Sequence, residues 1–214
     1  MALIRCFASF LILWACAASA QHGREPMHQR FDDPEQWAKV FDDPERDAWQ
    51  KPDKVLRALN LARDATVADI GAGTGYFAVR LAHALPKGKV YGIDVEPEMV
   101  RYLNQRAERD KLANLRAHLR AAADASLPEP VDVVLIVDTY HHMAGRAEYF
   151  TRLRHSLKAG ARVAIIDFKP ESPVGPPESH RIPAKQVMDE MAQAGYKLAT
   201  EHRFLPYQYF LIFN

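Results

Sequence analysis

VADIGAGTGYFAVRLA, residues 67–82, places three glycines at alternate positions between an apolar run and an amphipathic one. The first run is typical of a short buried strand, and residues 76–85 have the periodicity of a helix. Gly71, Gly73 and Gly75 tolerate positive φ and, having no Cβ, let a ligand approach the backbone closely. The helix start directs its amide N–H groups and positive dipole end to the same place. The stretch therefore predicts a strand–turn–helix unit that cradles a nucleoside-bearing ligand, with a merely tight turn as the alternative.

Strands and helices alternate along the rest of the chain. The pattern predicts strands at 66–70, 89–94, 115–122, 131–138 and 161–168. It predicts helices at 54–61, 76–85, 97–112, 146–157 and 182–194. The last two strands, 197–204 and 208–213, must run antiparallel because the link between them is far shorter than a parallel crossover requires. The predicted fold class is α/β: a doubly wound, mostly parallel seven-stranded sheet with a C-terminal antiparallel hairpin.

The first 20 residues differ in character from the rest. One basic residue, Arg5, precedes an apolar run that ends in Ala18-Ser19-Ala20, which is the layout of a secretory signal peptide cleaved after Ala20. A lipoprotein signal at Cys16 and an uncleaved N-terminal anchor are the alternatives, and the apolar run is short for a spanning helix. We therefore expect an exported protein, periplasmic or secreted, without a stable transmembrane anchor after cleavage.

Charge and cysteine content narrow the function classes. The 214 residues include 28 basic and 27 acidic side chains, and a net charge of +1 does not favour a broad nucleic-acid surface. Both cysteines, Cys6 and Cys16, lie in the expected signal peptide. The mature chain would therefore contain no disulfide, thiol nucleophile or thiolate metal site.

Residues 21–52 form an arm ahead of the alternating pattern. The sequence FDDPE occurs at 31–35 and again at 41–45, and Asp-Pro favours a helix N-cap followed by a first-turn proline. We expect two helix starts in an arm that either packs on the domain or closes over the glycine turn as a lid. In the second case Arg46, Trp49 and Gln50 would contact the ligand.

Four motifs follow the predicted strands in order. They are the acidic residue and glycines of 69–75, Asp94 at the end of the second strand, Ala123-Asp124-Ala125, and residues 138–142 after the fourth strand. From about residue 51 to 214 this order resembles the class I S-adenosylmethionine-dependent methyltransferases, whose sheet ends in a reversed strand. The resemblance implies a methyltransferase-like domain at 53–214, after the signal peptide (1–20) and the arm or lid (21–52). It assigns cofactor binding to Asp69, Gly71, Ala72, Gly73, Gly75, Asp94, Val95, Asp124, Ala125 and Asp138.

The resemblance also implies roles within that set. The glycine turn would hold the aminocarboxypropyl end of the cofactor, Asp94 would accept both ribose hydroxyls, and Asp124 would meet the adenine amino group. The spacing GxGxG, in place of GxGxxG, favours S-adenosylmethionine over NAD.

Methyl transfer from a sulfonium is an in-line displacement that needs positioning and exclusion of water more than it needs a base. An acceptor with a proton to lose would still gain from one. His141 and His142 are the candidate bases because the pKa of a histidine suits proton removal near neutrality, with a packing role as the alternative. Adjacent histidines do not chelate one metal ion comfortably, so we expect no metal site.

The acceptor pocket has weaker sequence signals. Its candidate residues are Trp49, Gln50, Tyr140 and Tyr207, with core packing as the alternative for the tyrosines. The proline-rich stretch 169–182 can form a stiff wall. These side chains favour a small, partly apolar acceptor over a nucleic acid, and nothing indicates the oligomeric state. An exported module that binds a nucleoside or metabolite without turnover is the alternative function.

Sequencing the N-terminus of the mature protein tests the expected export signal. We expect it to begin at Gln21. A start at lipidated Cys16, or an intact Met1, would contradict cleavage after Ala20.

Overall fold

The computed structural model describes residue 31 and residues 33–214. Our predictions for the signal peptide, its cleavage and the start of the arm lie outside the described residues. Within the described part, no helix is long and apolar enough to cross a membrane.

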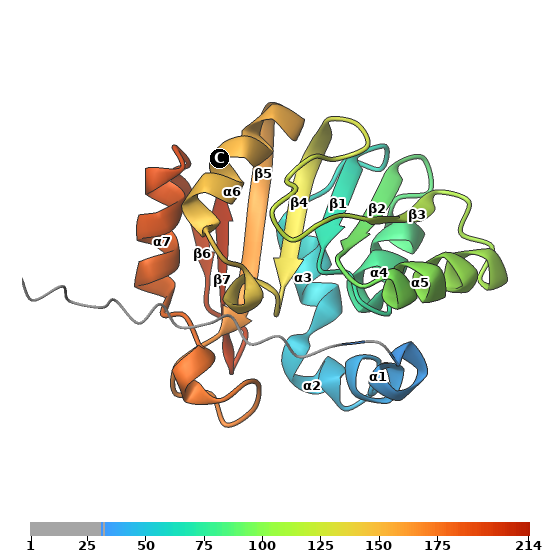
Figure 1. Ribbon diagram of the computed structural model, residues 1–214, viewed down its shortest axis with the longest axis horizontal. Coiled ribbons are helices and arrows are strands. Elements are labelled where there is room, and N and C mark those ends of the chain that lie inside the picture. The colour runs from blue at the N-terminus through green and yellow to red at the C-terminus, as the bar shows by residue number, and fades with distance from the viewer. Residues whose placement is uncertain (1–30, 32) are drawn as a thin grey trace, which may run out of the picture.

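The alternating pattern produces a sheet with helices on both sides (Figure 1). The described strands are β1 (Thr66–Ile70), β2 (Lys89–Asp94), β3 (Leu115–Leu119), β4 (Val131–Val137), β5 (Leu157–Phe168), β6 (Leu198–His202) and β7 (Gln208–Phe213). The α-helices are α1 (Pro34–Phe41), α2 (Arg46–Gln50), α3 (Pro52–Leu59), α4 (Tyr76–Ala84), α5 (Pro97–Arg109), α6 (Arg146–Leu153) and α7 (Ala184–Gln193). Short 3₁₀ helices are η1 (Tyr140–His142), η2 (Arg154–Ser156) and η3 (Glu178–His180).

The seven strands form one sheet in the order β3-β2-β1-β4-β5-β7-β6. Neighbouring strands from β3 to β5 are parallel, whereas β7 runs antiparallel to both β5 and β6. The carboxyl ends of the central strands therefore meet at one edge. The predicted fold class and C-terminal hairpin are confirmed.

Each face of the sheet is buried under its own helices. Val67 and Leu135 pack with the helices α3, α4 and α5, while Ala68 and Val134 pack with α6 and α7 on the other face. Successive strand residues point to opposite faces, so a strand covered on both faces is apolar throughout.

Several element boundaries differ from the predictions. The helix expected to reach residue 157 ends at Leu153 and continues as the single turn η2, because β5 begins early at Leu157, which pairs with Val131. The third strand ends at Leu119, opposite Asp94, because its neighbour β2 ends there.

The repeated FDDPE sequence acts differently in its two copies. Asp33 is the N-cap of α1, and its side chain accepts a hydrogen bond from the N–H of Gln36 (3.0 Å), as expected. In the second copy Asp43 instead accepts from the N–H of Glu45 (2.8 Å), and α2 begins at Arg46, two residues after the position that corresponds to the start of α1. The short side chain has closed a local turn in place of a helix start.

The glycine turn between β1 and α4 is shaped by packing as well as by conformation. Gly71, Gly73 and Gly75 have φ of 75°, 52° and 98°. The N–H of Gly71 donates to the carbonyl of Ile93 (2.7 Å), which ties the turn to the end of β2. A Cβ on Gly75 would lie 2.4 Å from Cδ1 of Leu103, so α5 leaves no room for a side chain there.

Gly75→Ala should lower the free energy of unfolding by about 2–5 kcal/mol. Positive φ costs a non-glycine residue about 1–2 kcal/mol, and overpacking against Leu103 adds about 1–3 kcal/mol. Gly160→Ala is the matched control, since φ is 75° there but nothing lies within 4 Å of the added Cβ. Urea denaturation followed by circular dichroism measures both, and equal losses would contradict the packing argument.

Candidate active site

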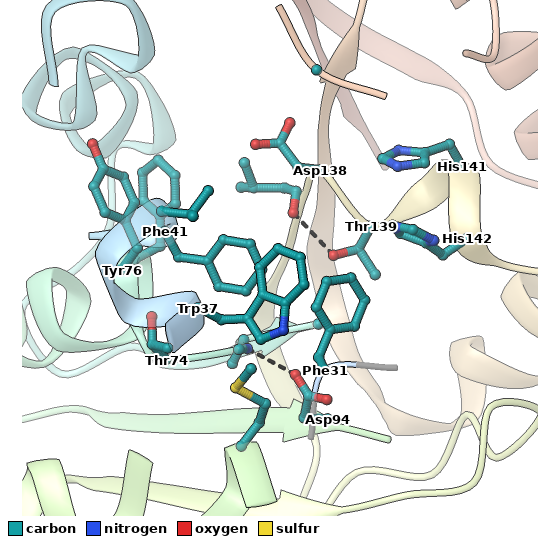
Figure 2. A pocket seen from close by; sticks show the side chains of 18 of the residues that line it. Phe31, Trp37, Phe41, Thr74, Tyr76, Asp94, Asp138, Thr139, His141 and His142 are labelled. Atoms are coloured by element: carbon teal, nitrogen blue, oxygen red, sulfur yellow. Dashed lines mark hydrogen bonds between the residues drawn. The ribbon is translucent and has the colours of Figure 1, made fainter. Parts of the chain in front are cut away.

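A cavity of about 700 Å³ lies at the carboxyl edge of the sheet, between the domain and the arm (Figure 2). Open α/β sheets bind ligands outside this edge. The arm helices α1 and α2 and the loop after β5 complete its walls. The lining includes these residues predicted from the sequence: Trp49, Asp69, Gly71, Ala72, Gly73, Asp94, Val95, Asp138, His141 and His142.

Asp94 is held in place by two backbone donors. Oδ2 accepts from the N–H of Gly73 (2.7 Å) and Oδ1 from the N–H of Glu96 (3.0 Å). Burial raises the pKa of Asp94 above its ordinary value, although these N–H groups oppose the shift. A carboxylate oxygen can accept more than one hydrogen bond, so this oriented group can still receive a pair of ligand hydroxyls.

Two features of the glycine turn face the cavity. A Cβ on Gly73 would lie 3.5 Å from Cδ2 of Phe41, so a side chain there would fill the space between turn and arm. The hydroxyl of Thr74 is buried and has no hydrogen-bond partner within the described residues. A bare backbone beside an unsatisfied hydroxyl is an arrangement that a polar ligand would complete.

Asp69 on β1 is a nearly fully buried carboxyl group in the same lining. Burial raises its pKa to about 7, the charge of Asp94 adds to this, and Arg46 opposes it. Near neutral pH the group is therefore divided between its two protonation states. A cationic ligand would favour the ionised form.

Arg46 on α2 brings the positive charge of the arm to the cavity. Its Nη2 donates to Oδ2 of Asp138 (3.0 Å) and to Oε1 of Gln50 (3.1 Å), and its guanidinium lies 4.0 Å from the centre of the Tyr76 ring. Asp138 follows β4 with φ of 54° and also accepts from the amide of Gln208. Burial raises the pKa of Asp138 to about 6, and Arg46 opposes this shift.

Further polar contacts hold the arm against the glycine turn. Asp47 on α2 accepts from the hydroxyl of Tyr76 (2.5 Å) and from Nη2 of Arg80 (3.0 Å), both on α4. Asp42 pairs with Nη1 of Arg106 on α5 (2.8 Å), which also donates to a backbone carbonyl of the glycine turn (3.0 Å). The arm therefore packs on the domain and covers the cavity.

Aromatic side chains line the arm side of the cavity. Trp37 and Phe41 on α1 stack with their ring centres 5.3 Å apart, and Phe31 meets Trp37 edge to face at 4.8 Å. Figure 2 shows the rings of Trp37 and Phe31 on the same side of the cavity as Asp94. Flat apolar surfaces beside the carboxylate suit an adenine ring above its ribose.

His141 forms a buried pair with Asp167, near the end of β5. Its Nδ1 lies 2.9 Å from each carboxylate oxygen of Asp167, and its backbone N–H donates to Oδ2 (3.1 Å). Burial lowers the pKa of His141, but the hydrogen bond and charge of Asp167, with the charge of Asp138, outweigh it and raise the pKa overall. His142 lies beside it, with the two ring centres 4.1 Å apart.

Three residues predicted to line the acceptor pocket do not lie in it. Tyr140 is buried under α6 and α7, where its hydroxyl donates to Glu190 (2.5 Å), because η1 turns the ring to that face of the sheet. Gln50 is fully buried and donates to Gln208 (2.7 Å) as part of the link between arm and sheet. Tyr207 lies outside the lining, against Trp49, with ring centres 6.1 Å apart.

Asp124 and Ala125 lie in the loop before β4, away from the cavity lining. The carboxylate of Asp124 is exposed and accepts from the N–H of Ser126 (2.9 Å). Their adenine-binding role stays a prediction. In the part of the chain that the structure describes, no three His, Cys, Asp or Glu side chains are placed to hold a metal ion.

The structure adds three residues that sequence reasoning did not assign. Asp167 supports His141, Gln208 supports Asp138, and Thr139 packs beneath the glycine turn, where a Cβ on Gly71 would lie 2.1 Å from its Oγ1. Asp167 has a sequence signal: like Asp94, it is an acidic residue directly after an uncharged run near the end of a strand. Gln208 has none, because its partner follows a strand 70 residues away.

Comparisons with known proteins agree with this geometry. A family described as "Methyltransferase domain" matches residues 61–205. A solved SAM-dependent methyltransferase from Aquifex aeolicus is 30% identical, with a TM-score of 0.78 over 85% of this chain and 97% of that one. The chain therefore belongs to the S-adenosylmethionine-dependent methyltransferase family.

Curated relatives match over shorter segments. The 27-O-demethylrifamycin SV methyltransferase of Amycolatopsis mediterranei is 31% identical over 54% of this chain and 43% of its own length. The ubiquinone/menaquinone biosynthesis C-methyltransferase of Syntrophotalea carbinolica is 30% identical over 56% of this chain and 51% of its own. The chain thus spans about half the length of these two relatives.

The residues present fit S-adenosylmethionine. Asp94 is oriented by the turn, and each of its oxygens can accept a further hydrogen bond. The unsatisfied hydroxyl of Thr74 belongs to the same cavity lining. The sulfonium and ammonium groups of this cofactor are cations, and Asp69 and Asp138 supply buried negative charge. The expected cofactor is therefore supported by the site itself.

Asp69→Asn should stabilise the ligand-free protein at high pH. The folded state keeps a proton on Asp69 up to about pH 7, whereas the unfolded chain loses it near pH 4, so this group destabilises the fold as pH rises through that window. The gain at pH 8 is at most about 4 kcal/mol and vanishes at pH 4.

Urea denaturation from pH 4 to pH 8 measures this gain. The control is Asp64→Asn, an exposed carboxylate in the turn before β1. An advantage for Asp69→Asn that does not change with pH would show that burial of Asp69 is not its cause.

Proposed function

We propose that this protein is an enzyme that transfers the methyl group of S-adenosylmethionine to a small-molecule acceptor bound beneath the arm. One observation carries the proposal: the oriented Asp94 and the bare glycine turn share a single cavity lining with Trp49, Phe168 and the prolines of the loop after β5. A cofactor half and an acceptor half of one cavity are what a direct transfer requires.

The cofactor supplies a methyl group on a sulfonium, which an acceptor atom attacks in line. The chain has to hold both partners and keep water out. In this proposal Asp94 and the glycine turn hold the cofactor. Trp49 on α2 and Pro176 in the loop after β5 line the part of the cavity that receives the acceptor. The arm covers both, and we propose that it acts as the lid, opening to admit them.

The acceptor class rests on the site rather than on the relatives. The names of the relatives include a C-methyltransferase and a methionine S-methyltransferase, so they do not choose the acceptor atom. The mostly apolar walls and the net charge of +1 support a small, partly apolar molecule rather than a nucleic acid.

We also propose that the enzyme is exported, on the layout of residues 1–20. S-adenosylmethionine is made in the cytosol, so an exported enzyme needs a supply of the cofactor in its own compartment.

Asp94→Asn should weaken S-adenosylmethionine binding about 10- to 100-fold. Hydrogen bonds to a charged group contribute about 1.5–3 kcal/mol, and the amide loses the charge and replaces one accepting oxygen with an NH2 donor. Isothermal titration calorimetry with S-adenosylmethionine, its demethylated product and NAD measures the affinities.

The matched control is Glu129→Gln, an acidic side chain that pairs with Lys89 away from the cavity. It should bind all three ligands as the unaltered protein does. Tighter binding of NAD than of S-adenosylmethionine would reject the proposed function, and an unchanged affinity of Asp94→Asn would refute the ribose assignment alone.

A further inference from the structure

We propose that His141 and Asp167 act together to remove a proton from the acceptor, and that the acceptor atom is a hydroxyl oxygen on a flat, largely apolar ring. This inference rests on the proposed function, because it describes the acceptor half of the same cavity. The geometry of the pair and the shape of the surrounding walls carry it.

The hydrogen bonds define which nitrogen of His141 carries the proton. Both carboxylate oxygens of Asp167 lie 2.9 Å from Nδ1, and an ionised carboxylate only accepts hydrogen bonds. The proton of the neutral ring therefore belongs on Nδ1, which leaves a lone pair on Nε2. His141 lines the cavity, and Nε2 has no hydrogen-bond partner among the described residues.

Asp167 is itself locked in position. It is 1% exposed, and its oxygens accept from the backbone N–H groups of Phe168 (2.7 Å) and His141 (3.1 Å). The His141 ring and the Asp167 carboxylate thus fix each other's position at the carboxyl end of β5. An aspartate in this position fixes the tautomer of the ring and stabilises the imidazolium that forms when Nε2 takes a proton.

Charged and titratable groups approach this pair from several elements. Asp138 follows β4 and forms an ion pair with Arg46 of α2. His142, in η1, lies next to the ring of His141. Tyr209 on β7 lies opposite Asp167 in the sheet register, with its pKa raised by burial and by the nearby acidic charges. Asp167 and Asp138 raise the pKa of His141 against the effect of burial. The charged ring is thus the stabilised product of proton transfer.

Flat side chains in the same cavity lining as His141 select the shape of the acceptor. Trp49 and Phe168 lie with ring centres 6.0 Å apart, and Pro176 and Pro177 complete this side. A Cβ on Gly175 would lie 2.6 Å from the ring of Phe168, so the proline loop is packed directly onto that ring.

Arg181 holds the same loop by donating to the carbonyls of Pro170, Ser172 and Pro176 at 2.6–2.8 Å. A stiff slot of rings and prolines suits a planar ring better than a flexible chain. Because His141 belongs to the same lining, the cavity suits a ring whose hydroxyl points at Nε2 of His141.

The atoms and electrons of the step balance. The hydroxyl proton passes to Nε2 of His141 while the oxygen lone pair forms the new bond to the methyl carbon. The carbon–sulfur bond breaks and its electron pair stays on sulfur, which becomes a neutral thioether. The imidazolium, held by Asp167, then returns its proton to water.

The tautomer can be tested without any acceptor. Nitrogen-15 NMR of labelled protein should show neutral His141 protonated on Nδ1 and titrating above the ordinary histidine pKa of about 6.5. Asp167→Asn should lower that pKa and mix the tautomers, while Asp189→Asn, an exposed carboxylate on α7, should change neither. Neutral His141 protonated on Nε2, or a His141 pKa that does not change in Asp167→Asn, would contradict the proposed pair.

The acceptor class is tested with phenol, 2-naphthol and 4-nitrophenol as probes. His141→Gln should reduce turnover of phenol and 2-naphthol about 10²- to 10⁴-fold, and turnover of the more acidic 4-nitrophenol much less, because it needs no base near neutral pH. His155→Gln, in an exposed turn, should match the unaltered enzyme. Asp167→Asn should lower kcat and move the pH profile with little change in KM.

Calorimetry separates failure of this inference from failure of the proposed function. His141→Gln should bind S-adenosylmethionine as tightly as the unaltered protein. If the unaltered protein binds the cofactor but methylates none of the phenols, or if His141→Gln reduces turnover of all three equally, the hydroxyl acceptor is wrong while the proposed function stands. If the unaltered protein does not bind the cofactor, the proposed function itself fails.

Discussion

Buried negative charge at one edge of the sheet is the constraint on which the rest of the site depends. In sheet order from β2 to β5, the acidic residues concerned are Asp94, Asp69, Asp138 and Asp167. Carboxylates gathered away from water are costly unless each finds donors, a counter-charge or a proton. Backbone N–H groups hold Asp94, Arg46 pairs with Asp138, and His141 pairs with Asp167. The backbone of Ala78 and the charge of Arg46 only partly offset the burial of Asp69, and its raised pKa marks the place where a cationic ligand gains most.

The arm is part of this electrostatic arrangement rather than an appendage. Arg46 supplies the cation for Asp138, and Asp47 reaches back to Tyr76, the first residue after the glycine turn. A change in the arm would therefore alter both the cover of the cavity and the charge within it. The same contacts would link the proposed closure of the arm to ligand binding, because a ligand cation near Asp138 would compete with Arg46 for that carboxylate.

Much of the site was predictable because its residues lie at strand ends. The glycine turn, Asp94, Asp138 and the adjacent histidines could be placed together, since parallel strands present their carboxyl ends at one edge. Tyr140 shows the limit of that reasoning. It directly precedes His141, yet η1 turns its ring to the opposite side of the sheet, towards Glu190. Nearness along the chain does not determine the side to which a ring points when a single helical turn intervenes.

The sequence by itself determined the order of strands and helices along the chain, the reversed final strand and the presence of a glycine turn between β1 and α4. These follow from local hydrophobic period, glycine conformation and the shortness of one link. Only the tertiary structure decided that Leu103 packs against Gly75, that Asp167 supports His141 and that Gln50 links the arm to Gln208. The reason is physical: each of these contacts joins residues far apart in the chain, and only the packed sheet and its covering helices bring them within reach.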